Sequence, residues 1–455
     1  MIEKPRDFPA VEELLQHEEL AEAVLLIPRP AAAEIIKATI ANAKAQLTKT
    51  HKPITLERLN NDIRKALLKA KRQEITRVIN ATGIVVHTNL GRAPLPAALF
   101  EAVKERVTGY GNIEFDLNTG GRGSRGLACE KYLVLLTGAE AGTVVNNCAA
   151  ALFLILNTLA NRKQVLLSRG EMVQIGGGFR IPDILKKSGG KLCEVGTTNI
   201  TTIKDYEDNI ETGRSGLILK VHKSNFVQSG FTEEANLKEL VTLGRKYGWP
   251  VVNDLGSGVF IDTRDILGYE EPTVGHSVRA GVDLTSFSGD KLLGGVQAGL
   301  IVGSSEYIKK IKRNPLFRTM RVDKVVFSIV EHLLSVYLSG DFQTDIHLWQ
   351  ILSIAESDLY QRGQKILSDL GHPSGLSVEA TKAFVGGGSM PEADIPSVGI
   401  VFSTAYSATR LMRQFRNRSL PIIGRIENDQ LILDLKAISE NDLSILTTAI
   451  KEVIE

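Results

Sequence analysis

Cysteine is scarce in this chain of 455 residues, which contains only Cys129, Cys148 and Cys193. Three scattered cysteines are too few for a disulfide framework or a zinc site, and such usage is typical of a reducing compartment. Apolar runs are short: residues 149–160 fall below the roughly 18 apolar residues that span a bilayer. Residues 1–7 do not form the apolar core of a signal peptide. We therefore expect a cytoplasmic protein without membrane segments.

Neither sign of charge dominates, because 54 Lys and Arg residues face 52 Asp and Glu residues. The distribution is uneven: residues 1–30 contain three basic and seven acidic residues, whereas residues 31–80 contain eleven basic and four acidic residues. The basic stretch includes Lys65, Lys69, Lys71, Arg72 and Arg77. This stretch could contact a phosphate backbone, or it could be the solvated face of a helix.

The length predicts more than one domain. Residues 1–75 have apolar residues at helical spacing, with Leu59, Ile63 and Leu67 on one face of a segment that begins after Thr55. We predict a small amino-terminal helical domain there.

In residues 76–325, short β-rich runs alternate with helical segments, which indicates a large α/β domain with a mostly parallel central sheet. The predicted strands are 142–146, 164–168, 192–195, 217–221, 250–253, 284–287 and 298–302. Residues 326–455 are helical through residue 370 and then contain a Gly-rich turn and two short strands. The turn is predicted at 386–389 and the strands at 398–402 and 430–435. We predict a smaller α+β domain for this last region.

Lys291 and Asp254 each follow a predicted strand of the large domain. Ligands in parallel sheets bind beyond the carboxyl ends of the strands. A lysine there can hold pyridoxal phosphate as a Schiff base, with Asp254 against the pyridinium nitrogen and Ser288 available to the phosphate. Alternatively, Lys291 is a buried lysine paired with Asp290, and Asp254 is an ordinary aspartate at a strand end.

Residues 146–151 follow another strand and open an apolar helix. The small residues Cys148 and Ala149, directly after Asn147, allow backbone amides to approach an anion at the helix amino terminus. That arrangement suits the phosphate of the cofactor, and an ordinary N-cap at Asn146 or Asn147 is the alternative.

Arginines form a third set. Its members are Arg92, Arg122, Arg125, Arg318 and Arg321. Arg122 and Arg125 belong to a Gly-rich loop that could form an anion nest, and we expect Arg318 and Arg321 to share a helix face. Guanidinium groups suit phosphate-like ligands, although unrelated surface arginines would give the same pattern. We interpret His87 and His222 as structural.

These residues resemble those of one family, the bacterial selenocysteine synthases, or L-seryl-tRNA(Sec) selenium transferases. The segments that carry the resemblance are 79–94, 145–151, 168–171, 175–183, 286–295 and 421–427. Cys148 stands where the family favours a small or polar residue, and this departure does not impair phosphate binding by backbone amides.

The resemblance implies a fold-type-I pyridoxal phosphate transferase, with Lys291 as the cofactor lysine and Asp254 as the pyridinium partner. It also implies an anion pocket for selenophosphate. The implied pocket residues are Arg92, Arg125, Arg318 and Arg321. The positions that match family residues near the substrate are Thr197, Thr198, Asn225 and Asp290. Bacterial members are similar in forming a homodecamer that is built from dimers, with the amino-terminal domain binding the tRNA.

The implied reaction converts L-seryl-tRNA(Sec) to L-selenocysteinyl-tRNA(Sec). Lys291 would remove the Cα proton, the β-hydroxyl would leave, and selenium from selenophosphate would add to an aminoacrylyl intermediate. Asp290 would assist proton transfer to the leaving hydroxyl or orient Lys291.

Two alternatives are different in kind. A pyridoxal phosphate-dependent ammonia-lyase acting on a small phosphorylated amino-sugar acid would keep Lys291 and Asp254 but would not need residues 1–75. A non-catalytic RNA-binding protein on a degenerate fold of this type would not need an intact set of lysine, aspartate and arginines.

Overall fold

The computed structural model describes residues 1–175, 178–211, 213, 215–390 and 393–455. It forms two compact units, Met1–Val78 and Ile79–Glu455. Gly176 and Gly177, in the segment 175–183 that carries part of the resemblance, lie outside the described residues.

The first unit is helical, as predicted. Its α-helices are α1 (Val11–Leu15), α2 (Ala21–Leu25), α3 (Arg29–Thr50) and α4 (Leu56–Lys71). The hydroxyl of Thr55 accepts a hydrogen bond from the Arg58 N–H at 3.1 Å and caps α4. Leu59, Ile63 and Leu67 are fully buried in the core of this unit, which confirms the predicted apolar face.

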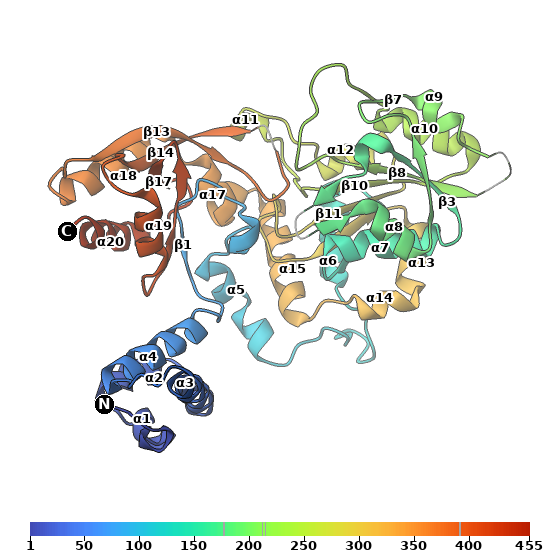
Figure 1. Cartoon of the computed structure of the whole chain (residues 1–455). Helices are drawn as coiled ribbons and strands as arrows, with labels where there is room; N and C mark the ends of the chain where they lie inside the picture. Colours follow the sequence, from blue (N-terminus) through green and yellow to red (C-terminus); the bar gives the residue numbers. More distant parts are fainter. Residues whose placement is uncertain (176–177, 212, 214, 391–392) are drawn as a thin grey trace. The chain divides into compact units, whose positions relative to one another are not determined.

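The second unit is built around a seven-stranded sheet with the order β2-β12-β11-β10-β8-β3-β6. The strands are β2 (Ala141–Val145), β3 (Gln164–Ser168), β6 (Lys191–Val195), β8 (Gly216–Val221), β10 (Val251–Gly256), β11 (Leu284–Ser288) and β12 (Gly299–Gly303). Strand β12 pairs antiparallel with β11 and β2, and the other four pairs of this sheet are parallel. The seven predicted strands and the mostly parallel sheet are therefore confirmed. Strands β3, β8, β10 and β11 of this sheet are labelled in Figure 1.

Helices cover both faces of this sheet, which explains why its strands are apolar runs rather than alternating patterns. Leu217 and Leu219 of β8 pack in a core with α7 (Cys148–Leu159) and α8 (Ile181–Ser188). Ile218, between them, packs with α10 (Leu237–Tyr247) on the opposite face.

A four-stranded antiparallel sheet follows near the carboxyl end, in the order β13-β14-β17-β16. Its strands are β13 (Leu376–Phe384), β14 (Asp394–Phe402), β16 (Arg425–Glu427) and β17 (Gln430–Asp434). Helices α18 (Glu356–Asp369), α19 (Ala408–Arg416) and α20 (Leu443–Ile454) contribute to the core beneath it. The two predicted strands correspond to β14 and β17. Strand β13 was not predicted, because most of its side chains are at least partly exposed and it has no apolar run.

Segments that are far apart in the sequence contact one another within the second unit. Strand β1 (Ile79–Asn80) pairs with β15 (Ile422–Ile423), and Ile84 forms a bridge with Phe384. Helix α15 (Lys324–Ser339) packs on α5 (Ala97–Thr108) and α6 (Leu127–Thr137). The division into residues 1–75, 76–325 and 326–455 stays a prediction.

Within the described part of the chain, no helix combines the length and the apolar character needed to cross a membrane.

Candidate active site

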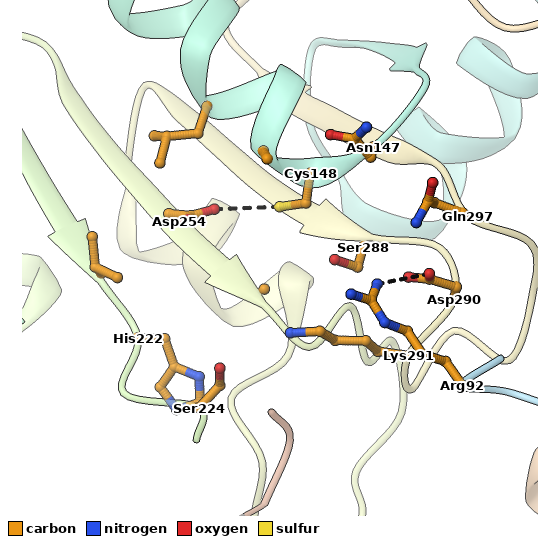
Figure 2. Close-up of a pocket in the computed structure, with 14 residues that line it drawn as sticks. Arg92, Asn147, Cys148, His222, Ser224, Asp254, Ser288, Asp290, Lys291 and Gln297 are labelled. Atoms are coloured by element: carbon orange, nitrogen blue, oxygen red, sulfur yellow. Dashed lines mark hydrogen bonds and ion pairs between the residues drawn. The ribbon is translucent and has the colours of Figure 1, made fainter. Parts of the chain in front are cut away.

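A cavity of about 280 Å³ lies where the carboxyl ends of β8, β10 and β11 meet the amino end of α7. Figure 2 shows the side chains that surround it. The lining residues are Arg92, Asn147, Cys148, Ala149, Leu152, Val221, His222, Ser224, Asp254, Gly256, Ser288, Asp290, Lys291 and Gln297. The structure therefore brings together the predicted lysine, the predicted pyridinium partner and every residue predicted to bind the cofactor.

Lys291 follows β11, and only 5% of its surface is exposed. Its Nζ donates a hydrogen bond to the carbonyl of Gly388 at 3.2 Å. Burial lowers the pKa of Lys291, because a charged amine is poorly solvated in the cavity. The amine is therefore easier to obtain in the neutral form that a nucleophile or a base requires. Gly388 belongs to the Gly-rich turn predicted at 386–389, for which the sequence suggested no role in the site.

Asp254 lies in β10 with 8% of its surface exposed. Its Oδ1 accepts a hydrogen bond from the Ser286 hydroxyl at 2.8 Å and a weaker one from the Cys148 thiol at 3.5 Å. Burial raises the pKa of Asp254, and the Ser286 hydrogen bond opposes that rise. Both contacts use Oδ1, so they orient the carboxyl group without occupying Oδ2.

Asn147 is the N-cap of α7, since its Oδ1 accepts a hydrogen bond from the Ala150 N–H at 2.8 Å. This confirms the N-cap interpretation for Asn147. The cap leaves the N–H groups of Cys148 and Ala149 in the first turn, where α-helical residues have no partner within their own helix. The first turn of a 12-residue helix thus presents donors and a positive dipole end to the cavity.

Asp290 is paired with Arg92, not with Lys291. The Nη1 of Arg92 lies 2.7 Å from the Asp290 Oδ2. The Asp290 Oδ1 is buried and has no hydrogen-bond partner among the described residues. The pairing of Lys291 with Asp290, which the alternative interpretation of this lysine required, is therefore wrong, because Arg92 takes the contact.

His222, interpreted from sequence as structural, lines the cavity. Its Nδ1 lies 3.3 Å from the Leu255 carbonyl and 3.6 Å from the Glu271 Oε1. Burial raises the pKa of Glu271, whose side chain is only 4% exposed. Sequence reasoning did not identify Glu271, Ser224 or Gln297. The local sequence does not distinguish Glu271 as a buried residue, because two glutamates before a proline are typical of an exposed turn.

The other predicted arginines lie elsewhere. Arg125, Arg318 and Arg321 line a separate pocket of about 490 Å³, together with Arg122 and Glu114. The structure thus does not bring Arg92 into one pocket with them. Arg318 and Arg321 also do not share a helix, because α14 (Pro315–Thr319) ends before Arg321 and the chain turns toward the N-cap of α15.

Thr197, Thr198 and Asn225 are not among the residues that line the cavity. Thr197 donates its hydroxyl hydrogen to the Ile200 carbonyl at 3.0 Å, and the Asn225 amide donates to the Gln174 carbonyl at 3.0 Å. These contacts stabilise the local backbone, and the substrate roles implied for the three residues stay predictions.

Known proteins of one family are similar to this chain over most of its length. A family model described as L-seryl-tRNA selenium transferase matches residues 78–439. The chain is 45% identical over 397 residues to L-seryl-tRNA(Sec) selenium transferase of Aquifex aeolicus, with 86% of this chain and 87% of the relative covered. It is 40% identical over 453 residues to the protein of the same name from Caldanaerobacter subterraneus, with 98% of both chains covered.

Among solved structures, D-glucosaminate-6-phosphate ammonia-lyase is similar with a TM-score of 0.61 and 17% sequence identity. The similarity covers 85% of this chain and 97% of that chain. At this identity the likeness concerns the fold alone, and together with the sheet topology it confirms the predicted fold class.

Proposed function

The chain belongs to the L-seryl-tRNA selenium transferase family, and from that membership we propose that it converts L-seryl-tRNA(Sec) to L-selenocysteinyl-tRNA(Sec) with pyridoxal phosphate as cofactor and selenophosphate as selenium donor. The observation that carries this proposal is the burial of Lys291 and Asp254 in one cavity beside the amino end of α7.

The cavity fits the cofactor by the chemistry of its donors. Lys291 would hold it through the ε-amine, and Asp254 would face its ring nitrogen. The first turn of α7 at Asn147, Cys148 and Ala149, with Ser288, would hold its phosphate. When bound, pyridoxal phosphate supplies an electron sink that stabilises negative charge at the Cα of the seryl group.

The residues of the chain have distinct tasks in this reaction. Lys291, whose pKa burial lowers, takes the Cα proton as a general base. Arg92 keeps the Asp290 carboxylate in place through the 2.7 Å ion pair. The Asp290 Oδ1 has no hydrogen-bond partner among the described residues. It accepts a hydrogen bond from Lys291 or guides a proton to the leaving hydroxyl of the seryl group.

The substrate is an ester of tRNA, and the first unit supplies a surface for nucleic acid. Lys65 and Lys69 are exposed one turn apart on α4, on the side away from its buried leucines. We assign tRNA binding to this unit. A homodecamer that is built from dimers and a cytoplasmic location belong to the same proposal and rest on the family resemblance.

The proposal is tested by turnover of purified protein with serine-charged selenocysteine tRNA and selenophosphate. Lys291→Met should abolish formation of selenocysteinyl-tRNA, measured by hydrolysis and analysis of the esterified amino acid. Lys436→Met is the matched control, because it removes another buried lysine that does not line the cavity. Absence of product from the intact, cofactor-loaded protein would contradict the proposal and favour a lyase acting on a small phosphorylated substrate.

A further inference from the structure

Three arginines of the second pocket converge on one carboxylate. The Glu114 Oε1 lies 2.6 Å from Arg125 Nη2, 2.9 Å from Arg125 Nε and 3.3 Å from Arg321 Nη1. The Glu114 Oε2 lies 3.5 Å from Arg122 Nη2. The hydrogen bond and charge of Arg125 lower the pKa of Glu114, which is therefore a carboxylate at neutral pH. The Glu114 carboxylate thus occupies two nitrogens of the Arg125 guanidinium and contacts one nitrogen of Arg321.

The pocket nevertheless keeps an excess of positive charge. Lys312 and Arg313 also line it, and its only other carboxylate among the described lining residues, Glu130, is paired with Lys312. Arg318 forms no ion pair with any described residue. Six cationic side chains thus face two carboxylates around about 490 Å³ of space. Such a pocket attracts an anion, and guanidinium forks suit phosphate-like oxygens.

The side chain of Glu114 is not enclosed by its surroundings. About a third of its side chain (32%) is exposed to solvent. It lies outside any helix or strand, in the stretch between α5 and α6. Rotation of its side chain would expose the charged group to water rather than bury it.

We propose that Glu114 is an internal competitor for the arginine pocket, so that an anionic ligand binds by displacing its carboxylate from Arg125 and Arg321. Displacing Glu114 costs the same free energy whether the ligand is a monoanion or a dianion, because the same carboxylate contacts are broken in both cases. Glu114 therefore weakens the binding of every anion by about the same factor. If the proposed function holds, the ligand is the selenium donor, and Glu114 is a residue that sets the affinity for it.

A purely structural role for Glu114 predicts the opposite result. If its main task were to brace Arg125 and Arg321, its removal would disorder both forks and weaken anion binding. The sign of the change in affinity therefore separates the two roles.

The experiment is a calorimetric titration of the full-length, cofactor-loaded protein with inorganic phosphate, at fixed pH and ionic strength. Glu114→Gln should bind phosphate about tenfold more tightly than the wild type, since a neutral amide competes for the guanidinium groups less strongly than a carboxylate. The same titration with nitrate, a monoanion, should show a gain of about the same factor, because the same carboxylate is displaced. A clearly larger gain for phosphate than for nitrate would mean that charge repulsion acts without displacement and would overturn the proposal.

Glu130→Gln is the matched control, because it makes the same charge change in the same pocket but at a carboxylate paired with Lys312. It should tighten phosphate binding clearly less. Equal tightening in both variants would mean that net charge acts without displacement, and weaker or unchanged binding in Glu114→Gln would also overturn the proposal. Should that variant not fold, Glu114→Asp keeps the charge but withdraws the carboxylate by one methylene, and an unchanged or reduced affinity there is equally contrary. Because phosphate binding is measured without turnover, failure of the proposed function does not affect this test.

Discussion

Lys291 and Lys436 show how burial acts on the same side chain in two settings. Both are at most 5% exposed, and burial lowers the pKa of each amine, to about 8 for Lys436. Lys291 faces a cavity that also contains Asp254 and Arg92. Lys436 donates to the Ile354 carbonyl at 2.7 Å and lies near Asp434. The two lysines therefore differ in the groups that lie next to the amine rather than in their burial.

The pKa of Lys436 predicts a pH-dependent contribution to stability. Its value of about 8 in the folded protein lies below the roughly 10.4 of an unfolded lysine, so the unfolded chain binds more protons between these values. Stability contributed by this residue consequently rises with pH from about 8 to about 10.4. Lys436→Met should therefore melt at a higher temperature than the wild type at pH 7, and most of that gap should close by pH 10. Scanning calorimetry of both proteins at the two pH values measures it, and a gap that is independent of pH would contradict the shifted pKa.

At the scale of elements, the turn after β13 brings the carboxyl-terminal sheet to the cavity. Gly386, Gly387 and Gly388 have φ values of 77°, 64° and 75°, in the left-handed region that favours glycine. The turn lies against Val86, and its Gly388 carbonyl reaches Lys291. The backbone conformation of this short element thus positions an acceptor for the amine.

Gly388→Ala tests the role of this turn. An added Cβ would lie 3.3 Å from the Lys291 Nζ and 3.6 Å from the Ser224 hydroxyl, so it should displace the lysine. We expect cofactor incorporation, followed by absorbance, to slow by about tenfold, as for a displacement that costs roughly 1.4 kcal/mol.

Gly371→Ala is the control for backbone strain, because Gly371 has the same φ of 75° and no atom would contact its added Cβ within 4 Å. Both variants should lose a similar amount of stability, while only Gly388→Ala should slow the incorporation of the cofactor. Equal rates in the two variants would show that the turn does not position Lys291.

At the scale of the whole molecule, the basic side chains proposed to bind tRNA and the cavity with Lys291 belong to different units. The basic side chains of α4 belong to the unit Met1–Val78, whereas both pockets belong to the unit Ile79–Glu455. A change in the first unit should therefore affect tRNA affinity without altering the cofactor site.

Reversing two charges of α4 tests this separation. Lys65→Glu with Lys69→Glu should weaken tRNA binding about tenfold at low salt. The slope of log Kd against the logarithm of the salt concentration should fall by up to the contribution of about two phosphate contacts. The absorbance of the bound cofactor should stay unchanged. Lys186→Glu with Lys187→Glu makes the same charge change at exposed positions of α8 and is the control. Unchanged affinity in the α4 variant would favour the alternative of a solvated helix face.

Much of the architecture was predictable because it depends on short-range patterns. Apolar runs such as 217–221 are buried from both sides in a parallel sheet, and the spacing of Leu59, Ile63 and Leu67 places them on one helix face. Strand β13 could not be predicted in this way, because its exposed side chains carry little apolar signal.

The candidate site was likewise predictable only where it depends on local sequence patterns. The pairing of Lys291 with Asp254 followed from the rule that parallel strands end at one edge of the sheet, since both residues come directly after a strand or at its end. The contact of Lys291 with Gly388 joins residues 97 positions apart, and the convergence of Arg321 on Glu114 joins residues 207 positions apart. No local pattern records such contacts.

The residue types and their strand positions were thus enough to indicate which chemistry the chain can carry and which elements carry it. The packing of distant segments assigned the partners: Arg92 rather than Lys291 for Asp290, Glu271 for His222, and Glu114 for three arginines. The physical reason is range. Hydrophobic periodicity and capping act within a few residues, whereas an ion pair or a buried hydrogen bond depends on which surfaces come together when the whole chain is folded.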